Sequence, residues 1–186
     1  MQSLIIFVFG LFSLLGSALG NKVIFINKTP HDRVVCWYPG ALPGTDPKNP
    51  QHYPPIPGTF VKAWGRGATP PIVWGGDYMF KSVYITTGEK GDCNSHHNVE
   101  GEVKFNGNYG YTWFDLSVVK TNEFGLGPQN EQIHWLRPAG GNYPLAGCSV
   151  FPCNNLFKFP GDTDYVLSTT QPELTAIICD GPCDSS

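Results

Sequence analysis

Short runs of alternating hydrophobic and polar residues, separated by glycine and proline, are the dominant pattern of this chain. Alternation with a period of two places successive side chains on opposite faces of a β-strand. The 22 glycines and 17 prolines leave no long uninterrupted window for a helix bundle. The pattern therefore predicts short strands at residues 22–27, 33–38, 58–64, 72–74, 78–86, 99–105, 109–119, 133–136, 165–168 and 174–179.

The segment 99–119 carries the clearest of these signals. Asn106-Gly107 separates two β-rich runs, which is typical of a two-residue hairpin turn. In the second run an apolar set alternates with a more polar set: Phe114, Leu116 and Val118 against Trp113, Asp115 and Ser117. Because the apolar set must face the core, Asp115 is expected on the opposite face, beside an aromatic ring.

The first 20 residues form a separate, leader-like segment. They contain no charged side chain, and an apolar run extends from Leu4 to Leu15. Small residues at Ala18 and Gly20 suit cleavage after Gly20, so the segment is predicted to be a secretory signal peptide. The run is shorter than the ~20 residues of a spanning helix. We therefore predict a signal peptide, 1–20, and a single β domain, 21–186, that is secreted and has no membrane span.

An even number of cysteines in a secreted chain indicates disulfides. The six are Cys36, Cys93, Cys148, Cys153, Cys179 and Cys183. Short spacings favour local Cys148–Cys153 and Cys179–Cys183 bridges. Cys36 would then pair with Cys93, and a Cys36–Cys179 bridge is the alternative.

The composition argues against some classes of function. The formal net charge is −3 and only 15% of residues are charged, which argues against a nucleic-acid partner, for which a basic stripe is typical. Aromatic residues make up 13% of the chain, so it has enough apolar surface to fold. His96 and His97 follow Cys93, but this spacing matches no zinc pattern, and we expect neither a metal nor a cofactor.

Three segments carry a resemblance to a known family: Val23-Ile-Phe-Ile-Asn27, the hairpin of Gly101–Phe105 with Trp113–Val119, and Gly147-Cys-Ser-Val-Phe-Pro-Cys-Asn-Asn155. In order and spacing the chain resembles the thaumatin-like protein superfamily, most closely its small secreted fungal members. The resemblance implies an all-β, thaumatin-like antiparallel β-sandwich with a disulfide-braced loop region. It also implies an acidic cleft, which in many members binds β-1,3-glucan and in some hydrolyses it.

The resemblance also assigns cleft residues. Glu102 and Asp115 match the cleft glutamate and aspartate of the hairpin, and Asp162 or Asp164 matches an aspartate after the disulfide region. Two positions depart from the family pattern: Lys120 replaces a cleft aspartate, and Ile85 lies near the position of a cleft arginine.

The expected hairpin register separates the two hairpin carboxylates. A two-residue turn at Asn106-Gly107 would pair Glu102 with Tyr111 and place Asp115 about 13 Å away, at ~3.3 Å per residue. A retaining glycosidase needs its two carboxylates ~5–5.5 Å apart. This spacing favours binding over hydrolysis.

We therefore expect a secreted, non-catalytic protein, extracellular or associated with the cell wall, that binds β-1,3-glucan or a related wall polysaccharide. Trp113 and Tyr111 could stack on sugar rings beside Glu102, Asp115, Asp162 and Asp164. One alternative is a weak endo-β-1,3-glucanase using Glu102, Asp115 and Asp162. The other is an effector or adhesin that binds an extracellular host protein through the proline-rich segment 39–58.

Two expectations complete the prediction. The chain is expected to be a monomer. Asn27-Lys28-Thr29 is a sequon, so Asn27 is a candidate glycosylation site.

Overall fold

The computed structural model describes residues 20–72, 75–87, 90–95, 98–123, 131–141, 143–162 and 164–186. Of the predicted leader, 1–20, only Gly20 belongs to these ranges, so the cleavage site and the single domain 21–186 remain predictions. His96 and His97 also lie outside them. No helix among the described residues has the length and hydropathy to cross a membrane.

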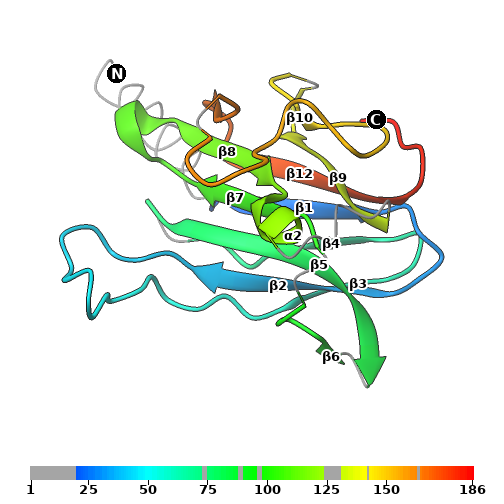
Figure 1. The fold of residues 1–186 in the computed structure, drawn as a ribbon, viewed down its shortest axis with the longest axis horizontal. Coiled ribbons are helices and arrows are strands. Elements are labelled where there is room, and N and C mark those ends of the chain that lie inside the picture. The colour runs from blue at the N-terminus through cyan, green and yellow to red at the C-terminus, as the bar shows by residue number, and fades with distance from the viewer. Residues whose placement is uncertain are drawn as a thin grey trace, which may run out of the picture.

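Two β-sheets form a sandwich-like, mostly β structure, as predicted at this level (Figure 1). The five-stranded sheet has the order β10 (Ala146–Gly147), β9 (Glu131–Pro138), β12 (Glu173–Asp180), β1 (Lys22–Asn27) and β4 (Arg66–Ala68). The seven-stranded sheet has the order β11 (Leu167–Thr169), β8 (Thr112–Ser117), β7 (Glu100–Lys104), β5 (Asp77–Thr87), β2 (Arg33–Pro39) and β3 (Thr59–Val61), with β6 (Lys90–Gly91) on β5. β1 pairs with β12 in parallel, and the other described pairings between strands are antiparallel.

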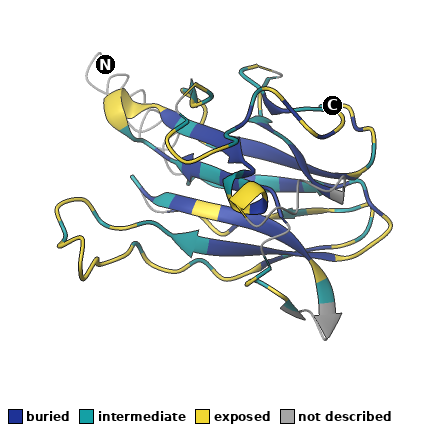
Figure 2. Ribbon diagram, in the orientation of Figure 1, coloured by how far each residue is buried: buried dark blue, intermediate teal, exposed yellow. Residues whose placement is uncertain are grey.

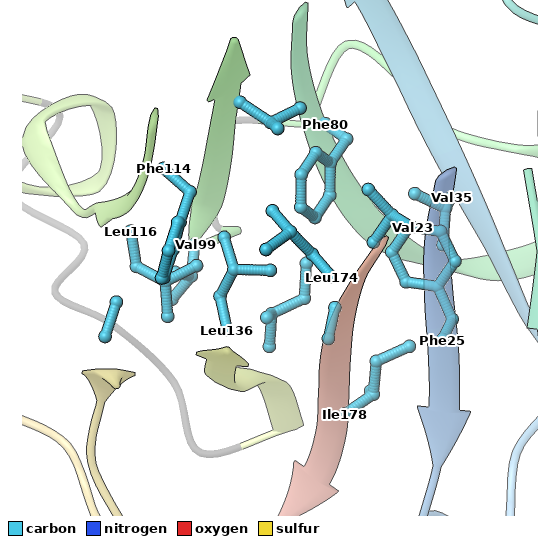
Figure 3. Packing of buried hydrophobic residues seen from close by; sticks show 14 of the residues in the cluster. Val23, Phe25, Val35, Phe80, Val99, Phe114, Leu116, Leu136, Leu174 and Ile178 are labelled. Carbon is cyan, nitrogen blue, oxygen red and sulfur yellow. The ribbon is translucent and has the colours of Figure 1, made fainter. Parts of the chain in front are cut away.

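The core lies between the two sheets. Its side chains come from the alternate, inward positions of the strands, such as Phe25 on β1, Phe80 on β5, Phe114 on β8 and Leu174 on β12 (Figure 3). Phe25 meets Phe80 edge to face, with ring centroids 5.5 Å apart. Burying each of these side chains contributes roughly 1.5–3 kcal/mol, so the period of two in the sequence is what selects the inward face. Figure 2 shows the complementary pattern, with exposed residues on the connections.

A buried polar link also joins the sheets. The side-chain Nδ2 of Asn98 donates to the carbonyl of Ser82 at 2.6 Å and to Oε1 of Gln132 at 3.3 Å. The same Oε1 accepts from the Val99 amide at 3.2 Å. Because Gln132 is on β9 and Ser82 on β5, these bonds constrain how the sheets are placed relative to each other.

Some elements were not among those predicted. Arg66–Ala68 forms β4 and pairs with β1. Gly67 also lets β4 approach β3, because a Cβ there would meet the carbonyl oxygen of Phe60 at 2.8 Å. Another such element is the short helix α2 (Val119–Glu123), which follows β8.

The six cysteines form Cys36–Cys93, Cys148–Cys153 and Cys179–Cys183. This is the pairing favoured by the local spacings, and the alternative Cys36–Cys179 bridge is not formed. Three disulfides in one chain are typical of proteins that fold in an oxidising, extracellular compartment.

A substitution at Gly147 would test how the Cys148–Cys153 loop packs against β9. Its φ is +106°, and a Cβ would meet the His134 carbonyl oxygen at 1.8 Å. Gly147→Ala should therefore lower the melting temperature by roughly 10 °C or more. Gly44→Ala is the matched control, since Gly44 also has positive φ but no neighbour within 4 Å. It should cost roughly 3 °C. If the two variants lose the same amount in melting temperature, the contact with the His134 carbonyl is not what requires glycine at position 147.

Candidate functional site

The β7–β8 hairpin has a different register from the one its turn sequence predicts. Glu102 pairs with Asp115, and Val103 pairs with Phe114. The connection is longer than Asn106-Gly107 alone, because a 3₁₀ turn at Asn108–Gly110 extends it. Val103 and Phe114 are both buried in the core, as expected, because a shift by four residues is a multiple of two and leaves each side chain on its expected face.

The expected distance between the two carboxylates is therefore wrong. Directly opposite residues on one face of an antiparallel pair have Cβ atoms roughly 4.5–5.5 Å apart. Glu102 and Asp115 are such a pair, where about 13 Å was expected. The fold thus brings together the two carboxyl groups that the resemblance assigned to the cleft.

Further charged side chains surround this pair on the outer face of the seven-stranded sheet. Glu100 is two residues from Glu102 on β7 and pairs across the strands with Lys81 on β5. Asp77 on β5 pairs with Lys104, whose Nζ lies 3.7 Å from Oδ2 of Asp77. The pair therefore lies in an acidic environment that is only partly neutralised.

Burial and like charge raise the pKa of both hairpin carboxyls. Asp115 is only 6% exposed, and its Oδ1 has no hydrogen-bond partner in the described chain. Burial is the main cause that raises the pKa of Asp115 to about 8, followed by the charges of Glu102 and Asp77. The pKa of Glu102 is also raised, by burial first and then by Glu100 and Asp77. At neutral pH Asp115 is thus mainly protonated.

A cleft of about 280 Å³ opens over this part of the sheet. Its lining combines carboxyl groups, one lysine and apolar side chains, chiefly Met79, Glu100, Glu102, Lys120, Phe157, Phe159 and Asp162. A second hollow, of about 250 Å³, shares Met79, Glu100 and Lys120 with it and extends to Tyr38, Lys81 and Cys93. Together the two hollows form a groove across the strands.

Lys81 is the buried cation of the second hollow, and it is only 5% exposed. Its Nζ donates to the carbonyl of Ser95 at 2.5 Å and lies 5.2 Å from the centre of the Tyr38 ring. Burial lowers the pKa of Lys81, and the charges of Glu100 and Asp92 act in the opposite direction. The Tyr38 hydroxyl donates to the Cys93 carbonyl, which ties this end of the groove to the Cys36–Cys93 bridge.

The other predicted site residues divide between the cleft and its surroundings. Asp162 lines the cleft, whereas Asp164 is exposed and does not. Trp113 is on the same face as Asp115, but its Nε1 points to the carbonyl of Asn108 at 3.4 Å and its ring packs edge-on against Tyr111. These two aromatic side chains lie at the hairpin end, outside the lining of the cleft.

Several residues of the cleft and the second hollow were not predicted. The alternation places Glu100 on the same face of β7 as Glu102, and Met79 on the same face of β5 as Lys81. Only the β5–β7 register shows that these two sets are neighbours. Phe157 and Phe159 could not be placed from alternation, because they follow the Cys148–Cys153 loop, where no periodicity exists. Their position depends on backbone pairing of Phe157 with the end of β8.

The environment of the Asn27 side chain does not suit the predicted glycosylation. Its side chain is 1% exposed, and its Nδ2 donates to the carbonyls of His31 at 2.8 Å and Lys62 at 3.0 Å. A glycan on this nitrogen is incompatible with the fold, because Asn27 holds two turns together from the inside.

The site can in principle transfer protons or bind hydrogen-bonding ligands. A protonated carboxyl beside a second carboxyl is the arrangement used in acid–base catalysis. Among the described residues, no group of three or more His, Cys, Asp or Glu side chains is placed to hold a metal ion.

Comparison with known proteins gives one partial similarity. A stretch of 62 residues is 36% identical to antigenic protein SchS21 of Stachybotrys chartarum, covering 33% of this chain and 40% of that protein. The chain thus spans about two-fifths of the length of this relative. No family model matches the chain, and no solved structure matches it. The comparison supports a distant similarity to a fungal antigen, and the thaumatin-like assignment stays a prediction.

Because of Asp115, the free energy of unfolding should decrease as the pH rises. Its pKa is about 8 in the folded chain and 3.8 as a free side chain. The folded state therefore binds more protons, and this stabilisation is complete below about pH 4 and is lost as the pH rises toward 8. Asp115→Asn should flatten the decline in the free energy of unfolding, measured by urea denaturation across this range, by up to about 1.4 kcal/mol per pH unit.

Asp164→Asn is the control, because Asp164 is exposed and lies outside the cleft. Its pH profile should match that of the wild type. If Asp115→Asn also keeps the wild-type slope, Asp115 is not a buried carboxyl with a raised pKa.

Proposed function

We propose that this protein is a secreted, thaumatin-like protein that binds β-1,3-glucan or a related cell-wall polysaccharide without cleaving it. The cleft above Glu102 is the binding site. The observation that carries this proposal is that Glu102 and Asp162 line one cleft with apolar walls, with Asp115 directly opposite Glu102 in the strand pairing. Carboxyl groups accept hydrogen bonds from sugar hydroxyls and, when protonated, donate them as well.

The dimensions of the groove suit a chain of sugar rings. The two hollows extend over residues of β8, β7, β5 and β2. Four neighbouring strands span roughly 14 Å at ~4.8 Å per strand. The apolar faces of the rings can pack on Phe157 and Phe159 while their hydroxyls reach the carboxyl groups.

Hydrolysis is the second candidate, and the direct pairing of Glu102 with Asp115 favours it. Directly paired residues have Cβ atoms roughly 4.5–5.5 Å apart, so their carboxyl groups can reach the ~5–5.5 Å separation of a retaining pair. Asp115, whose pKa is raised to about 8, is mainly protonated at neutral pH, as a general acid must be. Asp115 is nevertheless almost fully covered and does not line the cleft. Access to a scissile bond is therefore poor, and we place binding first.

Sedimentation with insoluble β-1,3-glucan tests the proposal. The wild type should appear in the pellet, with no soluble sugar in the supernatant. Asp162→Asn should weaken binding about ten-fold, because it removes one charged acceptor from the cleft. Asp164→Asn removes the same charge two residues away, outside the cleft, and should bind like the wild type.

Other outcomes separate the alternatives. Sugar released by the wild type but not by Glu102→Gln would establish a glucanase. Absence of the protein from the pellet, without sugar release, would overturn the proposal. It would also direct attention to a host-protein partner and the segment 39–58, which extends away from the sheets in Figure 1.

A further inference from the structure

Among the described residues, no cation pairs with Glu102 or Asp115. In the described chain, Lys104 pairs with Asp77 at 3.7 Å and Lys120 with Glu123 at 3.8 Å, and no ion pair reaches the two hairpin carboxyls. Two adjacent carboxyl groups of low exposure repel each other when both are charged. The free protein relieves this repulsion only by keeping a proton.

Asp115 gives a second, independent sign of a missing partner. Its side chain is 94% buried, on the face shared with Glu102, yet Oδ1 has no hydrogen bond among the described residues. Leaving a buried acceptor unsatisfied costs roughly 1–3 kcal/mol. Unsatisfied buried groups beside a cleft are typical of positions where a ligand completes the hydrogen bonding.

The missing partner is not a simple metal ion. Metal coordination needs several donors that converge on one point, and no such group of three exists among the described His, Cys, Asp and Glu residues. The carboxyls lie in rows along strands instead, and the wall beside them contains Phe157 and Phe159. A cation carried on a larger body with apolar faces fits this arrangement better.

We propose that the cleft prefers a polysaccharide with free primary ammonium groups, an amino-sugar polymer such as polyglucosamine, over a neutral glucan. This inference rests on the proposed function and specifies its ligand class. One ammonium group lies against Glu102, within a cross-strand spacing of Asp115. It donates hydrogen bonds to the Glu102 carboxylate, and its charge offsets the repulsion within the pair.

The lysines limit where such an ammonium group can bind. Lys81 lines the second hollow but not the first, whereas Lys120 lines both, next to Glu100. Lys120 pairs with Glu123 at 3.8 Å, so the buried charge of Lys81 is the one that disfavours a further cation in the second hollow. The preference for ammonium is therefore confined to the Glu102 end, while neutral parts of the polymer occupy the rest of the groove.

Calorimetric titration with three soluble oligosaccharides of equal length tests this inference: glucosamine, N-acetylglucosamine and β-1,3-glucose oligomers, at mildly acidic pH. The glucosamine oligomer should bind at least ten-fold more tightly than its acetylated counterpart, since only the ammonium group differs. Glu102→Gln should abolish that difference. Asp164→Asn removes the same unit of charge from an exposed position outside the cleft and should leave it intact.

Binding of the glucosamine oligomer should also release protons, seen as a dependence of the measured heat on the ionisation heat of the buffer, because the ammonium group favours the charged form of the pair. Equal affinity for the amine and its acetylated form, or a preference that survives Glu102→Gln, would overturn the inference. Binding of the glucose oligomer alone would do so too while leaving the proposed function in place. Binding of none of the three would overturn both.

Discussion

The register between β7 and β8 is the constraint on which the site depends. Val103 and Phe114 both belong to the core, and their pairing forces Glu102 opposite Asp115 on the outer face. A slip by one residue would expose the apolar set of β8 and bury the polar set. The same contacts that stabilise the sandwich therefore hold two carboxyl groups in an arrangement that electrostatics alone would disfavour.

That arrangement has a clear physical consequence. Burial raises the pKa values of both Glu102 and Asp115, and nearby negative charges add to this effect. The free site therefore carries less charge than its composition suggests. Core packing offsets the cost of this arrangement, and a ligand that supplied hydrogen-bond donors or a cation would recover it. Lys81, held by the Ser95 carbonyl, gives the far end of the groove the opposite charge. The two ends of the groove thus differ in charge, and this difference would orient a bound polysaccharide chain.

Much of the fold could be predicted from the sequence, because alternation reports directly on burial. The faces of β8 and the Cys148–Cys153 and Cys179–Cys183 bridges follow from local patterns. The Cys36–Cys93 bridge joins residues 57 apart in sequence, and local spacing left Cys36–Cys179 open as its alternative. The hairpin register did not follow from local patterns, since the 3₁₀ turn at Asn108–Gly110 lengthens the connection by four residues. A shift of four leaves the inward and outward faces unchanged, so the alternation carries no signal of it. Strand β4 was missed because the close approach of Gly67 to Phe60 is a tertiary contact. Phe157 and Phe159 lie in an irregular segment, where the sequence has no hydrophobic periodicity from which their position could be predicted.

The most direct test of this account is the titration of the Asp115 carboxyl carbon by NMR. The account predicts an apparent pKa near 8 for Asp115, and a lower value in Glu102→Gln, because that substitution removes the neighbouring negative charge. A carboxyl that titrates near its ordinary value of 3.8, with no response to Glu102→Gln, would show that the two groups are not coupled. The proposed site would then lose its basis.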